Sequence, residues 1–274
     1  MFPTMETRPK KRLTLKNSSR GLLILTAVAL FGAWLILTPD GLLGKSDAIG
    51  YSVCHRIEAR SFFIGDRQTP LCARCSGMYL GMLVSLIYLL RYGRRTEFPP
   101  LKITLPLSLF FVAFGVDGLN SYIQFFPNAP ALYQPTNLLR LITGTGLGMM
   151  VPVFLVPVFH QIMWTERSER PALERWSQAA PLLGLVGLTS LAVYSEISWL
   201  LYPLAVLSAW TVPIILGICY ALVWVMIFHK ENTYAGLKQA WVPLLAGFTT
   251  AMLQIGLVDL LRYHFTGTWA GFQL

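Results

Sequence analysis

Three of the chain's four cysteines lie in one segment, VCHRIEARSFFIGDRQTPLCARCSGMYLG, which covers residues 53–81. Cys54 is followed directly by His55, and Cys72 and Cys75 form a Cys-x-x-Cys pair with an arginine between them. The pair is predicted to lie at the N-terminus of a membrane helix, where unpaired backbone N–H groups and a neighbouring cation favour a thiolate. The segment therefore offers thiols suited to redox or metal chemistry.

Three interpretations of these cysteines remain open. In the first, Cys72 and Cys75 cycle between dithiol and disulfide. In the second, Cys54, His55, Cys72 and Cys75 bind a metal tetrahedrally, and zinc suits these ligand types, although the adjacent Cys54 and His55 would have to point the same way. In the third, a structural disulfide pins the outer loop. Cys219 lies inside a hydrophobic block and is expected to be a small core residue.

A second group of polar residues is expected at the same depth as the cysteines. Asp117 and Asn120 end one predicted helix, Asp259 and Arg262 end another, and Arg140 begins a third. Charged residues in membrane segments usually face the bundle interior and mark a site, and arginine suits an anionic headgroup or phosphate. The alternative is that these carboxylates and arginines pair as structural links between helix ends. The candidate substrate- or anion-binding residues are Arg56, Arg74, Asp117, Asn120, Arg140, Asp259 and Arg262.

The elements that must position these residues are membrane helices. Of the 274 residues, 54% are hydrophobic and 13% are charged, about half the charged content of a soluble domain. Spanning a bilayer takes roughly 20 apolar residues as a helix. The predicted spans cover residues 21–38, 73–90, 103–119, 138–162, 178–195, 203–228 and 242–261. The fifth and sixth are separated by few polar residues, so one long broken helix is an alternative there.

The charge distribution predicts the topology. Lysine and arginine gather in residues 1–20 and in the loops at 91–102, 167–175 and 230–238, which the positive-inside rule assigns to the cytoplasm. The N-terminus is then cytoplasmic and the C-terminus extracytoplasmic. Residues 1–20 form a basic cytoplasmic tail, and residues 21–274 form one transmembrane domain with an extracytoplasmic, cysteine-containing loop at 39–72. That loop breaks the rule, because it carries Lys45, Arg56, Arg60 and Arg67.

Three short motifs resemble those of a known family. The first joins Cys-His-Arg at 54–56, Arg-Ser-Phe-Phe at 60–63 and Leu-Cys-Ala-Arg-Cys at 71–75; the second is Asp117-Gly118 with Asn120; the third is Arg140 with Thr143-Gly144. They are similar to the signature of predicted multi-pass prokaryotic membrane proteins catalogued as DUF2085, a domain of unknown function. The resemblance covers roughly residues 50–150. It implies a bacterial or archaeal cell membrane and one site made by the cysteines and the polar set, and it implies no activity.

Three functional hypotheses follow. In the first, the chain is a thiol- or metal-dependent membrane enzyme, with Cys72, Cys75 and His55 as the catalytic candidates and zinc as the candidate cofactor. In the second, it binds or transports an anionic lipid or small anion. In the third, it is a non-catalytic subunit, whose stripe of small residues at 73, 77, 81 and 85 docks a partner helix. The expected partner is the lipid bilayer, and nothing in the sequence indicates nucleic-acid binding.

Overall fold

The computed structural model describes residues 17–126 and 132–271, so most of the predicted basic tail at 1–20 lies outside the described residues. Within these ranges seven helices are long and apolar enough to cross a membrane. They are α1 (Asn17–Leu37), α3 (Ala73–Leu90), α4 (Leu101–Ile123), α5 (Asn137–Met163), α6 (Trp176–Tyr194), α7 (Ser198–Ile227) and α8 (Leu237–Thr266). The chain is an all-α polytopic bundle, and each helix coincides with one predicted span.

The fifth and sixth predicted spans are separate helices. α6 ends at Tyr194 and α7 begins at Ser198, and the backbone between them reverses at Glu196, whose φ is 50°. A left-handed residue cannot continue a right-handed helix, which explains the break. The alternative of one long broken helix is therefore wrong.

The predicted loop at 39–72 contains more structure than its sequence indicated. It holds α2 (Gly41–Val53), a short 3₁₀ turn (Glu58–Arg60), and the hairpin strands β1 (Phe63–Ile64) and β2 (Arg67–Gln68). α2 has 13 residues, which is too short to span a membrane, and it packs against α7 and α8. Its burial comes from tertiary contacts, which hydropathy cannot reveal.

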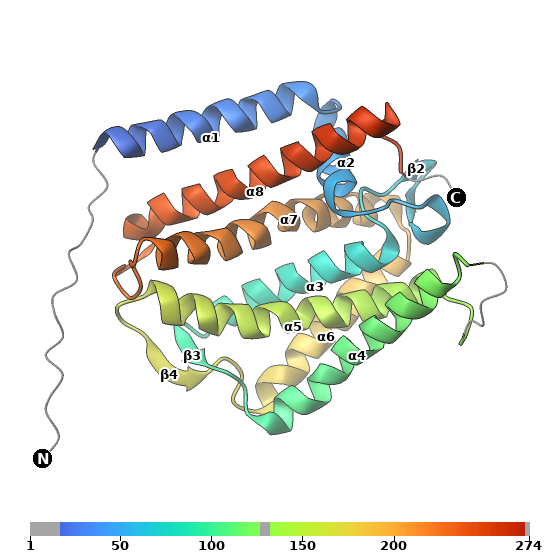
Figure 1. The fold of residues 1–274 in the computed structure, drawn as a ribbon. Helices are drawn as coiled ribbons and strands as arrows, with labels where there is room; N and C mark the ends of the chain where they lie inside the picture. Colours follow the sequence, from blue (N-terminus) through green and yellow to red (C-terminus); the bar gives the residue numbers. More distant parts are fainter. Residues whose placement is uncertain (1–16, 127–131, 272–274) are drawn as a thin grey trace, which may run out of the picture.

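The helices form three groups in Figure 1. α1, α8 and α7 lie on one side, α3 and α5 lie in the middle, and α4 and α6 lie on the other side. α3 and α5 approach closely because small residues face each other. A Cβ added at Gly81 would lie 2.4 Å from the carbonyl oxygen of Thr145, and one added at Gly148 would lie 1.9 Å from that of Met78. The small-residue stripe of α3 thus packs against α5 of the same chain, not against a partner helix as the third hypothesis supposed.

The loops gather at the two ends of the bundle as the predicted topology requires. At one end, β3 (Arg95–Glu97) pairs with β4 (Ser168–Pro171), and Trp164 bridges to Tyr234, so the three loops predicted as cytoplasmic are joined. We call the other end, which holds the cysteines, the cysteine end. Figure 1 shows α2, β2 and the C-terminal segment there.

The basic residues that break the positive-inside rule have structural partners at the cysteine end. Lys45 donates to carbonyl oxygens at the end of α1, where a cation is favourable. Arg56 and Arg67 both form ion pairs with Asp47, at 2.9 and 2.7 Å. Arg60 donates to the carbonyl oxygen of a residue in α4. These contacts explain why basic residues occur at the end of the bundle where the positive-inside rule predicts few.

Candidate functional site

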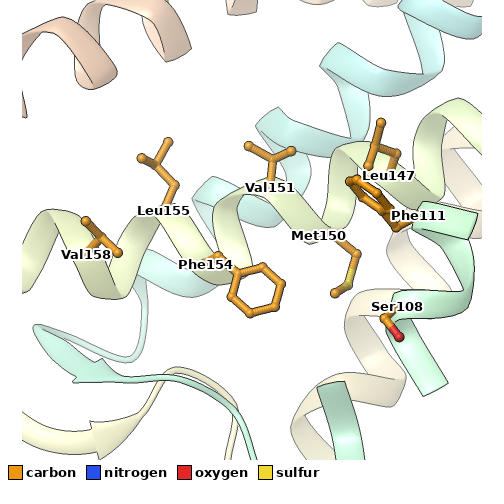
Figure 2. Close-up of a pocket in the computed structure, with 8 residues that line it drawn as sticks. All are labelled: Ser108, Phe111, Leu147, Met150, Val151, Phe154, Leu155 and Val158. Carbon is orange, nitrogen blue, oxygen red and sulfur yellow. The ribbon is translucent and has the colours of Figure 1, made fainter. Parts of the chain in front are cut away.

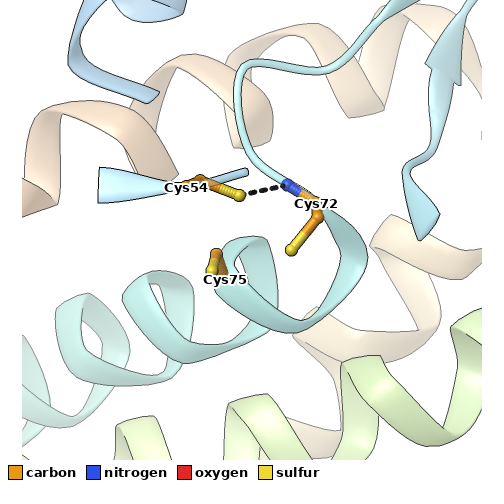
Figure 3. Close-up of side chains that lie close together, drawn as sticks. All are labelled: Cys54, Cys72 and Cys75. Carbon is orange, nitrogen blue, oxygen red and sulfur yellow. Dashed lines mark hydrogen bonds between the residues drawn. The ribbon is translucent and has the colours of Figure 1, made fainter. Parts of the chain in front are cut away.

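Three cysteines from two chain segments meet at the cysteine end. The sulfur atoms of Cys54, Cys72 and Cys75 all lie within 4.8 Å of one another. Cys54 follows α2, Cys72 is the N-cap residue of α3, and Cys75 lies in its first turn. Figure 3 shows the three side chains gathered at the start of α3. All four cysteines of the chain are free thiols in the structure.

Backbone N–H groups point at the sulfur of Cys54. The N–H groups of Arg56 and Cys72 each donate to it at 3.4 Å, the second bond being the dashed line in Figure 3. Arg56 adopts a left-handed φ of 50°, which turns its N–H back toward the cysteine. Taken alone, backbone hydrogen bonds to this sulfur favour the thiolate, the form that binds metals, but the hydrogen bond of Cys54 to Cys72 and its burial outweigh them.

Two predicted anion-binding arginines hold this turn in place. Arg56 is buried, pairs with Asp47 and donates to the carbonyl oxygen of Trp269. Arg262 donates to the carbonyl oxygens of Tyr51 and Cys54, at the C-terminal end of α2, where a cation complements the helix dipole. Both arginines therefore position Cys54 in this structure.

The three thiols are unequal in acidity. Hydrogen bonds from Cys54 and Cys75, together with the positive charge of Arg74, lower the pKa of Cys72 well below its ordinary value. The hydrogen bond to Cys72, and then burial, raise the pKa of Cys54 to about 12. In metal-free protein, Cys72 therefore ionises before Cys54.

This inequality predicts the pH dependence of alkylation in metal-free protein. An ordinary thiol loses reactivity about tenfold for each pH unit below its pKa, because only the thiolate reacts. Cys72 should instead lose reactivity less steeply than an ordinary thiol as the pH falls, since its pKa is lowered. Cys54 should react slowly throughout. Iodoacetamide labelling with peptide mapping measures each rate, and a Cys72 rate that falls as steeply as that of an ordinary thiol would contradict the assignment.

A second polar network joins α3, α4 and α5 beside the cysteines. The Asp117 side chain is 1% exposed and accepts hydrogen bonds from Arg74, from the hydroxyl of Tyr133 at 3.0 Å and from that of Thr143 at 3.3 Å. Burial and its bond to Asp117 raise the pKa of Tyr133, so the phenol keeps the proton it donates. Asn120 holds the chain near Tyr133 by accepting and donating backbone hydrogen bonds. Arg74 thus links the Cys-x-x-Cys motif directly to Asp117.

Two further arginines extend this network. Arg60 donates to the carbonyl oxygen of Ser121, to whose hydroxyl Arg74 also donates. The pKa of Arg60 is lowered by partial burial and by the positive charge of Arg74, as expected where like charges are gathered. Arg140 is 6% exposed and donates to Asn137, but its buried Nε has no partner among the described residues. We call Arg60, Arg74 and Arg140 the arginine cluster.

Replacing Asp117 with asparagine should destabilise the fold. The change removes the carboxylate that balances Arg74, and leaving one partner of a buried pair uncompensated costs about 3–5 kcal/mol. The measurement is thermal unfolding in detergent, followed as loss of the folded monomer on size exclusion. Asp66→Asn, in the exposed hairpin turn, is the matched control and should unfold as wild type does. Equal stability of both variants would show that the pair is unimportant.

The structure separates several predicted site residues from the cluster. His55 is exposed, and its ring nitrogens are not among the ligand atoms that gather with the sulfurs. Asp259 accepts a hydrogen bond from Trp34 instead of pairing with Arg262. Cys219, expected in the core, is exposed on α7. Sequence reasoning missed Arg60, although it stands in the first motif and in the loop that breaks the positive-inside rule.

A hollow of about 470 Å³ between α4 and α5 lies away from this site. Figure 2 shows its lining, which includes Phe111, Met150 and Phe154. The hydroxyl of Ser108 is its one polar side-chain group and already donates within α4. The hollow therefore suits a lipid acyl chain and offers no group for chemistry.

Comparisons with known proteins find a family model and two relatives, and the family model covers the clustered cysteines, α3, α4 and most of α5. A family model described as "Predicted membrane protein (DUF2085)" matches residues 54–154. An uncharacterized protein of Methanocaldococcus jannaschii is 33% identical over 113 residues, covering 41% of this chain and 67% of that protein. An uncharacterized protein of Methanothermobacter thermautotrophicus is 26% identical over 111 residues, covering 40% of this chain and 91% of that protein. No solved structure matches the chain significantly.

Proposed function

The chain belongs to the predicted membrane protein family DUF2085, and we propose that it is a metal-dependent membrane enzyme with a zinc ion bound by Cys54, Cys72 and Cys75. The main support for the proposal is that three sulfur atoms from two segments lie within 4.8 Å of one another. Thiolates are soft ligands that select zinc or copper(I) over magnesium or calcium. We propose zinc because it also accepts a fourth, non-protein ligand.

The number of ligands favours catalysis over a purely structural role. Structural zinc sites usually have four protein ligands, whereas catalytic sites have three and keep the fourth position for water or substrate. Cys54 is buried, whereas Cys72 and Cys75 are partly exposed as whole residues. A metal there would lower the pKa of a bound water or polarise a substrate oxygen.

The arginine cluster suggests the substrate class. It places three cations beside the cysteines: Arg74 pairs with Asp117, whereas Arg60 donates to the carbonyl oxygen of Ser121 and Arg140 donates to Asn137. The Nε–H group of Arg140 has no partner among the described residues, so it could donate to an oxyanion. We therefore take the substrate to carry a phosphate or carboxylate, whether in a lipid headgroup or a small molecule.

The proposed location is the extracytoplasmic side of a prokaryotic cytoplasmic membrane. Both curated relatives come from archaea, and the positive-inside rule assigns the cysteine end to the outside. A metal site at this level would act on substrates that reach it from outside or from the outer leaflet.

The test is the metal content of the purified full chain, measured by mass spectrometry of the elements, combined with cobalt(II) substitution. Bound zinc at about one ion per chain is expected, and cobalt should give intense sulfur-to-cobalt charge-transfer bands together with the visible bands of tetrahedral geometry. Copper in place of zinc would overturn the choice of metal. A Cys72–Cys75 disulfide that leaves only Cys54 and Cys219 to alkylate would overturn the metal site in favour of redox exchange or structural pinning.

A further inference from the structure

A second pocket lies on the opposite side of the bundle from the arginine cluster, between α1 and α8. It has a volume of about 350 Å³, and its lining is mostly leucine and aromatic side chains. Leu37, Leu253, Leu257 and Leu260 belong to the lining and are also exposed on the outer surface of the bundle. The pocket therefore reaches the lipid-facing surface, so a molecule dissolved in the bilayer has access to it.

One carboxylate lies in this apolar lining. Asp259 is 3% exposed; its Oδ2 accepts a hydrogen bond from the indole N–H of Trp34 at 3.1 Å, and its buried Oδ1 has no partner among the described residues. The described residues form no ion pair with Asp259, and the nearby Arg262 is directed to the carbonyl oxygens of Tyr51 and Cys54. A buried carboxylate oxygen without a donor is costly, and within a membrane segment it marks a functional site.

Aromatic rings line the pocket together with the carboxylate. Trp34, Tyr263 and Trp269 all line the pocket with Asp259. Electron-rich ring faces attract cations, and a carboxylate supplies the acceptor for an N–H group. No arginine or lysine is among the residues described as lining the pocket, so the lining itself offers a phosphate no cationic partner. Lys45 lies at its edge, where its ammonium group already donates to the carbonyl and hydroxyl oxygens of Thr38.

From these contacts we propose that the pocket binds the ammonium group of a lipid-soluble alkylamine, with Asp259 as its hydrogen-bond acceptor. The aromatic rings lie around the cation, and the leucines contact the alkyl chain. An amine-bearing phospholipid fits less well because of its phosphate. This site is independent of the proposed zinc centre and stands whether or not the cysteines bind a metal.

The experiment uses the full chain in phosphatidylcholine nanodiscs and dodecylamine that carries a photoreactive diazirine in its chain. After illumination, peptide mapping should locate the label in residues 30–38 and 253–263. Unlabelled dodecylamine should compete, whereas dodecanol and dodecanoic acid should not. Competition by dodecanol as strong as that by dodecylamine would overturn the proposal, and so would displacement of the label by phosphatidylethanolamine.

Two pairs of variants test the role of the carboxylate and the role of the pocket's volume independently. Asp259→Asn keeps an oxygen for Trp34 but presents N–H donors to the ligand, so labelling should fall about tenfold or more. Asp40→Asn, at an exposed position near the same end of α1, should label as wild type does. Unchanged labelling of Asp259→Asn would refute the proposed role.

The space is tested at Gly256, which lines the pocket. A Cβ there would lie 3.9 Å from Trp34, an ordinary contact, so Gly256→Ala should label normally. Gly256→Phe should fill the pocket and reduce labelling about tenfold while Asp259 remains, which keeps the proposal testable if Asp259→Asn fails to fold. Full labelling of a folded Gly256→Phe protein would contradict the location.

Discussion

Replacing any one of Cys54, Cys72 and Cys75 with serine is expected to remove most of the bound zinc from purified protein. Each sulfur is one of three protein ligands in the proposed centre, and a serine hydroxyl is neither soft nor ionised at neutral pH. Metal content should fall at least about tenfold from the wild-type value, since changes even to groups behind the ligands cost 10–100-fold in metal affinity. Elemental analysis after dialysis against a weak chelator measures the loss.

The matched control is Cys219→Ser. Cys219 is exposed on α7, away from the three clustered sulfurs, and this variant should retain its zinc. The three cluster variants should also remain folded, because the packing of α3 on α5 does not involve the sulfurs. If zinc is lost equally from Cys219→Ser, or is retained by all three cluster variants, the metal centre is not where we propose it. Loss of folded protein together with zinc would instead indicate that the metal is structural.

A large loss of stability is expected from Gly148→Ala. An added Cβ would lie 1.9 Å from the carbonyl oxygen of Met78, far inside van der Waals contact, and the obstructing atom is backbone of a packed helix. α3 and α5 would have to separate, which costs about 3 kcal/mol or more. The measurement is the yield of monodisperse protein and its thermal unfolding in detergent.

Gly115→Ala in α4 is the control for this variant, because nothing lies within 4 Å of a Cβ added there. Alanine favours helix over glycine by about 1 kcal/mol, so this control should be neutral or slightly stabilised. If Gly148→Ala unfolds at the same temperature as Gly115→Ala, then α3 and α5 do not pack as closely as described.

Zinc binding and the packing of α3 on α5 are linked, because both helices carry residues of the candidate site. α3 carries Cys72, Arg74 and Cys75, and α5 carries Arg140 and Thr143, so the close helix contact sets the distance between the cysteines and the arginine cluster. Gly144 contributes to the same contact, because its added Cβ would lie 2.2 Å from the carbonyl oxygen of Arg74. A variant that separates these helices should therefore weaken anion binding as well as stability.

Hydropathy and loop charge were sufficient to predict the spans and the gathering of loops at two ends. A helix that crosses lipid must satisfy its backbone internally over a fixed length, so hydropathy locates it without knowledge of the neighbours. The alternation of basic and non-basic loops then predicted that the cysteines, Asp117 and Arg140 lie at the same, extracytoplasmic end of the bundle. The small-residue stripe of α3 was also readable, because a spacing of four puts those residues on one helix face.

Which side chains meet depends on contacts between distant segments, which the sequence pattern does not reveal. Cys54 and His55 are neighbours in sequence, but the left-handed turn at Arg56 and its ion pair with Asp47 leave the cysteine buried and the histidine exposed. Likewise, Arg262 stands three residues from Asp259 yet donates to the end of α2. Pattern and spacing place residues on an element, but the direction and partner of each side chain depend on segments that are distant in sequence, here α2 and α1.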